Sequence, residues 1–282
     1  MAQQKPKTRR LLLYRPGAKG INDAVLDQLR AAFPGFTLAE LRHHQDFREL
    51  VTERATIVVA GGDGTVGHAC RVLAGSAHRL AILPLGTFNN FARSLDIPER
   101  LEDAIKVARA GRTRAVTLGL AADRFFLEVA AIGAFGGAIA LGERAKEGEF
   151  GNLARDLRAL AGAKPFEYDI TGDFEAHGHA RSLVFANTRT TGNQIGLVAS
   201  DPVRPYLELP VDVGRSRLDL VGRAVAAAVL DRHEEDMGMT LRFRRLTIDT
   251  RPRVQVYADN KRLGRTPVQI QARPRALRVA VP

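Results

Sequence analysis

The chain has 282 residues, enough for two domains of ordinary size, and its 45% hydrophobic and 26% charged residues exclude an intrinsically disordered protein. Lysine and arginine outnumber the acids by 42 to 31, and the formal net charge of +11 favours an anionic partner, such as a nucleotide or an acidic membrane surface. Because there is no tryptophan and only four tyrosines to stack on bases, nucleic acid is not the expected partner.

Strands and helices alternate through the first 115 residues. Short apolar runs typical of buried strands are Leu11–Tyr14, Phe36–Leu41, Thr56–Ala60 and Leu80–Leu83. Helical patterns follow them at 21–32, 46–53, 66–73 and from Pro98 to Gly111. This alternation predicts an open parallel sheet, in which ligands bind beyond the carboxyl ends of the strands.

The pattern changes after Val116. Helices are expected at 133–146 and 152–160, and otherwise short apolar segments lie between turns. The expected strands are 116–120, 124–131, 166–171, 181–187, 218–221, 241–249, 254–258, 268–271 and 277–281. The sequence therefore predicts an α/β domain with an open parallel sheet at 1–116 and a mainly antiparallel β-sandwich at 117–282.

A glycine-rich loop directly follows the expected strand 56–60. Gly61, Gly62 and Gly64 allow a ligand to approach the backbone closely, and the helix start that follows directs N–H groups toward an anion. Asp63 places a carboxylate beside that anion, as a bridging divalent cation would require, and Thr65 adds a hydroxyl. The alternative is a tight turn in which Asp63 caps the helix.

A longer motif follows the expected strand 80–83. Pro84-Leu85-Gly86-Thr87-Phe88-Asn89-Asn90-Phe91-Ala92-Arg93 resembles the Pro-Leu-Gly-Thr-x-Asn-Asp-Phe-Ala-Arg signature of the diacylglycerol kinase catalytic-domain family, with Asn90 in place of Asp. That family includes sphingosine kinases and bacterial lipid kinases. The glycine loop is shared more widely, with NAD kinases and phosphofructokinases. The segment Thr266–Val279 resembles the family's terminal segment.

The resemblance implies a lipid kinase that transfers the γ-phosphoryl group of ATP to a lipid hydroxyl, with Mg²⁺ as the metal. The lipid would be diacylglycerol or a ceramide or sphingoid-type lipid. ATP would lie on Gly61–Thr65 and Gly86–Asn89, with Asp63 organising the metal and the phosphates. Thr87 would offer a hydroxyl to the phosphates, and Asn89 would either fix its loop or contact the nucleotide.

Two departures from the family pattern lie in the first domain. The family's first phosphate loop, Asn-Pro-x-Ser-Gly, is replaced by the segment 15–20, in which Arg15 and Lys19 are candidate phosphate-binding cations. The glycine loop is followed in the family by Asn-Glu, where this chain has Gly67 and His68.

Two further departures lie in the second domain. The family's Asp-Gly-Glu turn, whose Asp is the general base on the lipid hydroxyl, corresponds to Asp259-Asn260-Lys261. Asp259 is thus the candidate base, and the alternative is an ordinary hairpin tip. Arg215 stands where the family has a magnesium-binding Asp, so we expect that structural metal site to be absent.

The cellular setting is inferred from weaker signals. Cys70 is the only cysteine, which excludes intramolecular disulfides, and the apolar stretch 125–141 contains Glu128 and glycines, so it is a poor membrane span. We expect a cytoplasmic protein, with peripheral contact to the anionic inner face of the membrane through its arginines; solvated surface is the alternative. The oligomeric state stays open, a homodimer included.

Two other functions are compatible with the sequence. One is a catalytically weakened protein that binds a nucleotide or a lipid, because the family's Asn-Pro-x-Ser-Gly, Asn-Glu and Gly-Glu elements are lost. The other is a soluble kinase of the NAD-kinase type, against which the Gly86–Arg93 motif argues.

Overall fold

The computed structural model describes residues 9–18, 20–41, 51, 55–146, 163–191, 195–196, 200–210 and 240–282. The chain divides into two compact units, one made of Met1–Val116 with Arg275–Pro282 and the other of Thr117–Pro274. This division differs from the expected domains in one respect, since the last eight residues join the first unit rather than the second. We describe each unit by itself.

The first unit is built on a parallel sheet. Its strands are β1 (Arg9–Tyr14), β2 (Thr37–Glu40), β3 (Ala55–Gly61), β4 (Arg79–Pro84) and the last part of β18 (Val268–Ala280), in the order β2-β1-β3-β4-β18. All four neighbouring pairs are parallel. The order changes direction between β1 and β3, and that switch point is where ligands bind in such sheets.

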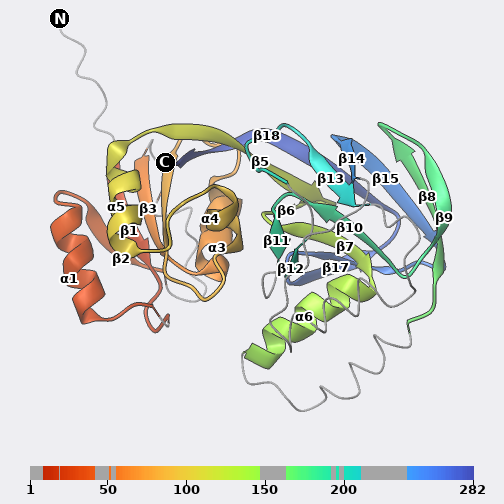
Figure 1. The fold of residues 1–282 in the computed structure, drawn as a ribbon, viewed down its shortest axis with the longest axis horizontal. Coiled ribbons are helices and arrows are strands. Elements are labelled where there is room, and N and C mark those ends of the chain that lie inside the picture. Colours follow the sequence, from red (N-terminus) through yellow and green to blue (C-terminus); the bar gives the residue numbers. More distant parts are fainter. Residues whose placement is uncertain are drawn as a thin grey trace, which may run out of the picture. The chain divides into compact units, whose positions relative to one another are not determined.

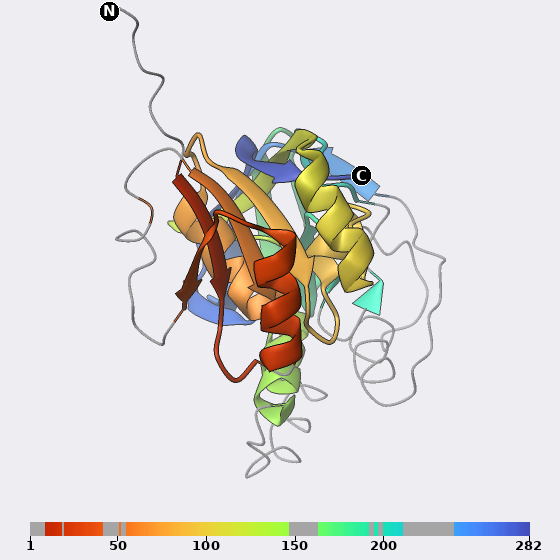
Figure 2. The ribbon, with the colours of Figure 1, turned by 90° about the vertical axis from the view of Figure 1, so that its left-hand side faces the viewer.

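Helices cover this sheet on both sides. They are α1 (Asp23–Ala32), α3 (Asp63–Leu73), α4 (Asn90–Ser94) and α5 (Leu101–Ala110). Figures 1 and 2 show α1 and α5 on one face of the sheet and α3 on the other. The central strands are buried almost completely because both faces are covered, which explains why their sequences are nearly continuous apolar runs.

A histidine fixes the start of β3. The Ala55 N–H donates a hydrogen bond to Nδ1 of His78, at 3.0 Å. Burial lowers the pKa of His78 from its ordinary value of 6.5. The ring is therefore neutral at pH 7, as an Nδ1 acceptor must be.

The second unit contains two antiparallel sheets. The first contains β18, β15 (Arg245–Arg251), β8 (Phe166–Gly172) and β9 (Ala176–Ala180) in that order, with β5 (Thr113–Ala121) and β6 (Arg124–Phe126) alongside. The second has the order β14-β13-β10-β7-β16-β17. Its strands are β14 (Thr240–Phe243), β13 (Leu207–Pro210), β10 (Ser182–Ala186), β7 (Val129–Gly133), β16 (Gln255–Ala258) and β17 (Lys261–Arg265). A separate pair is formed by β11 (Thr190–Thr191) and β12 (Ile195–Gly196).

One apolar core joins the two sheets, which confirms the predicted β-sandwich. Leu246, Ile248 and Ile270 from the first sheet share it with Phe185 and Phe243 from the second. Alternation along β15, exposed at every other residue, shows one face in the core and one outside. Helix α6 (Ala134–Lys146) covers the other face of the second sheet, where Phe135 packs in a smaller apolar cluster.

Several element boundaries differ from the expected ones. Helix α3 begins at Asp63 rather than at 66, and α4 was not expected. The segment 124–131 is two strands rather than one, because the backbone bends at Leu127 and Glu128. Strands β9, β13 and β17 were missed, since they are short or polar.

Two further differences arise where strands change partners. The segment 241–249 breaks at Arg244 because β14 belongs to one sheet and β15 to the other. The segments 268–271 and 277–281 form the single strand β18, in which Pro274 lies between the register with β15 and that with β4. A proline, which has no N–H to donate, falls in the stretch of β18 between these two registers. The expected elements 152–160 and 218–221, Arg215, and all of 46–53 except Val51 lie outside the described residues.

Candidate functional site

The glycine loop forms the first turn of a helix. Strand β3 ends at Gly61, Gly62 is the N-cap residue of α3 without a capping side chain, and Asp63 opens the helix. The Gly62 carbonyl accepts hydrogen bonds from the N–H groups of Thr65 and Val66, both at 3.0 Å. The N–H groups at the start of the first turn have no acceptor within the helix, so they are available to an anion.

The second loop is closed by one asparagine side chain. Asn89 has a left-handed backbone, with φ of 51°, and is the N-cap residue of α4. Its Oδ1 accepts a hydrogen bond from the Gly86 N–H at 3.0 Å, and its Nδ2 donates to the Gly86 carbonyl at 2.9 Å. Of the two roles considered for Asn89, this geometry matches loop fixing. Thr87 is exposed on the same loop.

The two loops touch each other. The Asn89 N–H donates to Oδ2 of Asp63 at 2.9 Å, so the second loop orients the carboxylate of the first. A β-carbon on Gly86 would lie 2.4 Å from Cα of Gly62, which no real structure tolerates. Both positions therefore require glycine for a steric reason, and the contact brings the ends of β3 and β4 into one site.

A third loop completes the site from the end of β1. Arg15, Pro16, Gly17 and Ala18 follow that strand, and the Ala18 N–H donates to the Arg15 carbonyl at 3.3 Å. Lys19, the other candidate cation of this loop, lies outside the described residues.

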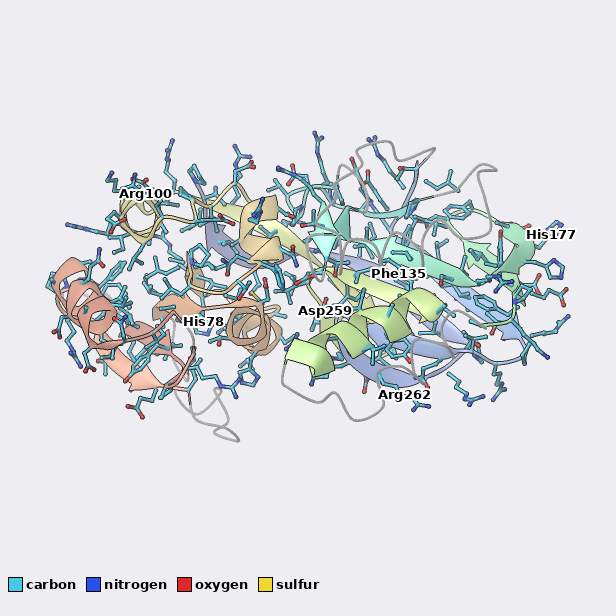
Figure 3. The ribbon with its side chains drawn as sticks, turned by 60° about the horizontal axis from the view of Figure 1, so that its bottom comes forward. His78, Arg100, Phe135, His177, Asp259 and Arg262 are labelled. Atoms are coloured by element: carbon cyan, nitrogen blue, oxygen red, sulfur yellow. The ribbon has the colours of Figure 1, made fainter. Side chains whose placement is uncertain are left out.

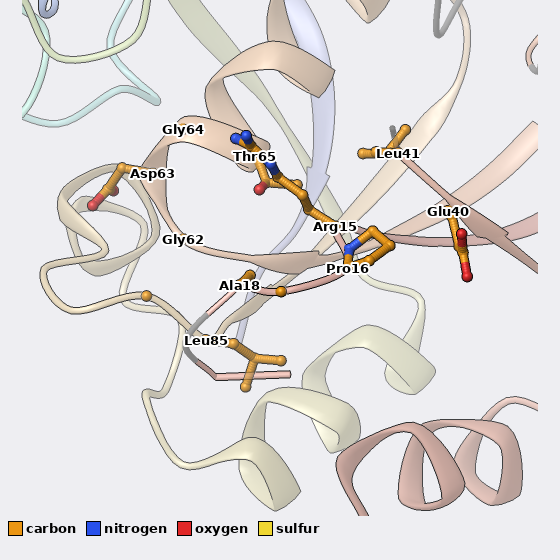
Figure 4. A pocket seen from close by; sticks show the side chains of 12 residues that line it. Arg15, Pro16, Ala18, Glu40, Leu41, Gly62, Asp63, Gly64, Thr65 and Leu85 are labelled. Atoms are coloured by element: carbon orange, nitrogen blue, oxygen red, sulfur yellow. The ribbon is translucent and has the colours of Figure 1, made fainter. Parts of the chain in front are cut away.

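These loops enclose a pocket of about 790 Å³ in the first unit. It lies at the switch point between β1 and β3, and its size is ordinary for a small-molecule site. In Figure 4 the Asp63 carboxylate lies at one end of the pocket and Glu40 at the other. The lining residues are Arg15, Pro16, Gly17, Ala18, Glu40, Leu41, Gly62, Asp63, Gly64, Thr65, Leu85 and Gly86.

The pocket suits a nucleotide with its phosphates. It offers helix N–H groups, the Arg15 guanidinium, and open space beside Gly64, where a β-carbon would meet nothing within 4 Å. Within the described ranges, no group of three or more His, Cys, Asp or Glu side chains is placed to hold a metal. Because Mg²⁺ is commonly held by one or two carboxylates together with substrate phosphates, Asp63 alone is a fitting protein ligand.

Asp259 lies in the other unit, at the turn between β16 and β17 (Figure 3). Its backbone is left-handed, with φ of 50°. Its Oδ1 accepts hydrogen bonds from the N–H groups of Leu127, Glu128 and Val129, at 3.2, 2.9 and 3.3 Å. The carboxylate thus holds the bend that separates β6 from β7, whatever else it does.

The structure brings together most of the residues predicted for the nucleotide site. Arg15, Gly62, Asp63, Gly64, Thr65 and Gly86 line one pocket, Gly61 ends the strand before it, and Asn89 fixes its second loop. Asp259 belongs to a different unit. Sequence reasoning missed Glu40 and Leu41, although both follow the rule that ligands bind at the carboxyl ends of parallel strands, since they stand at the end of β2.

Comparison with known proteins finds similarity in the segment that forms this pocket. Residues 15–121 match the model of the diacylglycerol kinase catalytic domain. A protein of Citrobacter koseri named "Probable lipid kinase YegS-like" is 32% identical over 160 residues, which are 54% of this chain and 53% of that protein. A Klebsiella pneumoniae protein of the same name is 33% identical over 144 residues, 49% of this chain and 48% of that protein. The chain therefore spans about half the length of the curated relatives it matches.

The fold has a solved counterpart along nearly its full length. A crystal structure of a diacylglycerol kinase from Bacillus anthracis has a TM-score of 0.74 with 24% identity, and 99% of each chain is covered. At that identity the likeness concerns the fold, and both units of the chain share it. Residues 15–121 are thus similar to the diacylglycerol kinase catalytic domain, and the remaining residues share the fold of the solved structure.

Proposed function

We propose that this protein is an ATP-dependent lipid kinase, which phosphorylates the hydroxyl of diacylglycerol or of a ceramide or sphingoid-type lipid. The observation that carries the proposal is the pairing of two glycine loops, Gly61–Thr65 and Gly86–Asn89, in one pocket at the switch point of the sheet. Phosphoryl transfer needs positioning and charge neutralisation more than covalent chemistry, and this pocket offers both. The lipid-kinase names of the relatives support the same assignment.

In the proposed reaction, each polar group has a task. The N–H groups at the start of α3, together with Arg15 and Lys19, bind the phosphates. Asp63, oriented by Asn89, would be the protein ligand of Mg²⁺. Bound Mg²⁺ would neutralise charge that develops on the transferred group.

Asp259 is the proposed general base. The lipid hydroxyl oxygen forms a bond to the γ-phosphorus as the bond to the ADP oxygen breaks, the hydroxyl proton passes to the Asp259 carboxylate, and ADP leaves with the electron pair of the broken bond. The carboxylate is held by backbone N–H groups, so it reaches the substrate in a fixed orientation.

An assay of the purified protein with labelled ATP tests this function. Dispersed diacylglycerol, ceramide, sphingoid bases and polyprenols are offered with Mg²⁺, and NAD is offered in parallel. We expect label in one lipid product and none in NAD. Label in NAD would indicate the soluble-kinase alternative, whereas nucleotide binding without turnover on any acceptor would indicate the weakened binding protein.

We also propose a cytoplasmic location and a membrane-contact surface on the second unit, the β16–β17 hairpin. Arg253, Lys261, Arg262 and Arg265 are exposed on it, and Figure 3 shows Arg262. The acid within 253–265 is Asp259, whose carboxylate is directed at backbone N–H groups. No described helix is both long and apolar enough to cross a bilayer.

Neutralising two of these cations is expected to weaken vesicle binding. At roughly 1 kcal/mol for each basic residue near an anionic surface, the Lys261→Gln/Arg262→Gln variant should bind phosphatidylglycerol-containing vesicles roughly 30-fold more weakly in co-sedimentation. The matched control, Arg109→Gln/Arg112→Gln, removes the same charge from exposed positions of the first unit. An equal loss in the control, or equal binding to neutral vesicles, would contradict this surface.

A further inference from the structure

The face of α3 that carries Asp63 contains an arginine folded back over a glycine. Asp63, Gly67 and Arg71 occupy successive turns of this face, four residues apart. Gly67 is buried although it has no side chain. A β-carbon on Gly67 would lie 3.1 Å from Nη1, 3.4 Å from Nη2 and 3.6 Å from Cζ of Arg71. The guanidinium therefore occupies the space that a side chain at position 67 would fill.

This conformation carries the Arg71 charge toward the nucleotide pocket. Side chains on a helix lean toward its N-terminus, so a long side chain at Arg71 covers the turn before it. Arg71 itself is in the last turn of α3, where a cation is favoured by the helix dipole. Its guanidinium instead lies one turn back, beside Gly67 and nearer the electropositive N-terminal end of α3. Anions near that end would offset the repulsion between this cation and the helix dipole.

One anion near the N-terminal end of α3 is the Asp63 carboxylate. Asp63 stands one turn beyond Gly67 in the direction in which the guanidinium points, and its carboxylate faces the Asn89 loop. A nucleotide bound at the glycine loop would add its phosphates beside Asp63. The sequence also changes here in a matching way, since Gly67 replaces a residue that is Asn in the family pattern. The smaller residue makes room for a cation from the next turn.

We propose that Arg71 is a phosphate-directed cation of the nucleotide site, and that Gly67 is a specificity-determining position because its lack of a side chain admits the guanidinium. This inference rests on the proposed ATP-binding function and deepens it. Arg71 assists binding and charge neutralisation at the phosphate end that Asp63 organises.

Nucleotide binding measured by calorimetry tests the role of Arg71. We expect Arg71→Gln to weaken Mg-ATP binding about tenfold while the affinity for AMP, which lacks the terminal phosphates, changes by less than about twofold. Arg71→Lys keeps the charge and should recover part of the loss. The Arg109→Gln control removes an equal charge at an exposed position of α5 and should bind both nucleotides as wild type does. The loss in Arg71→Gln should also shrink as salt is raised.

A substitution at Gly67 tests the second half of the inference. Asn at position 67 fills the space of the guanidinium, so Gly67→Asn should weaken Mg-ATP binding in the same direction as Arg71→Gln. If Gly67 acts through Arg71, the double variant should bind no more weakly than the weaker single variant. Thermal melting of each variant shows whether the fold is retained. If Arg71→Gln melts early, the Mg-ATP affinity of Arg71→Lys is compared with that of wild type instead.

The outcomes separate this inference from the proposed function. Wild-type protein that binds Mg-ATP, with Arg71→Gln binding ATP and AMP as wild type does, would overturn the role of Arg71 and leave the kinase proposal intact. Additive losses in the double variant would overturn the link between Gly67 and Arg71. Wild-type protein that binds no nucleotide would overturn the proposed function, and the inference with it.

Discussion

The Asp259→Asn variant is expected to lose lipid phosphorylation by about 10²–10⁴-fold in kcat, the usual contribution of a positioned general base, while its affinity for Mg-ATP stays that of wild type. The amide cannot accept the proton of the lipid hydroxyl. The proposed nucleotide site lies in the first unit and Asp259 in the second, so binding should be untouched. Initial rates at saturating ATP and calorimetry on the same preparation measure the two quantities.

The structure makes asparagine a suitable replacement here. Oδ1 of Asp259 accepts from all three N–H groups of the bend, whereas Oδ2 accepts only from that of Leu127 among the bonds described, at 3.2 Å. An amide oxygen in the place of Oδ1 preserves these contacts. Asparagine also tolerates the left-handed backbone, φ of 50°, better than most residues. Asp259→Asn should therefore fold normally and report on chemistry.

Two comparison variants separate catalysis from structure. Asp259→Ala removes all acceptors from the bend, and each lost charge-assisted hydrogen bond contributes about 1.5–3 kcal/mol, so this variant should melt earlier. Asp123→Asn makes the same charge change at an exposed turn of the same unit and should keep full activity. Asp259→Asn with an undiminished kcat would assign Asp259 to holding the bend alone.

The sequence could predict the nucleotide half of the site because its signals are local. A buried strand followed at once by glycines and a helix has few possible geometries, and parallel strands bring their carboxyl ends to one edge. These signals predict that Asp63 and Gly86 belong to one site, whereas Arg15 was assigned through the family resemblance. The start of α3 was placed three residues late because Gly62, Asp63 and Gly64 have low helix propensity, although their backbone is set by contact with the Gly86 loop.

The other features depend on contacts between distant residues. The bend at Leu127 exists because Asp259, more than 130 residues later, accepts its N–H group, and no local pattern reveals such a pair. The same applies to the Arg244 break, where Asp173 accepts the N–H groups of Arg244 and Arg245. The sequence does not single out Arg71, because only the folded structure shows its guanidinium in the space beside Gly67.

Gly86→Ala is the second change from which we expect a large effect. Its β-carbon would stand 2.4 Å from Cα of Gly62 and 2.8 Å from Oδ1 of Asn89. The first of these neighbours is backbone, which cannot rotate away, so the two loops must move apart. Overpacking of this kind costs about 1–3 kcal/mol of stability. Displacement of the loops by about 1 Å should lower kcat/KM roughly 10²-fold, because Asn89 would no longer orient Asp63.

Alanine substitutions at two other glycines serve as comparison variants for Gly86→Ala. Gly64 and Gly264 each have open space where a β-carbon would go, but only Gly64 lines the pocket. Alanine at either position should leave the melting temperature unchanged or slightly raised. Gly264→Ala should also bind Mg-ATP normally, whereas Gly64→Ala should bind it more weakly, since its methyl group enters the space that the phosphates need. Normal binding by both Gly64→Ala and Gly86→Ala would mean that the phosphates do not approach the glycine loop.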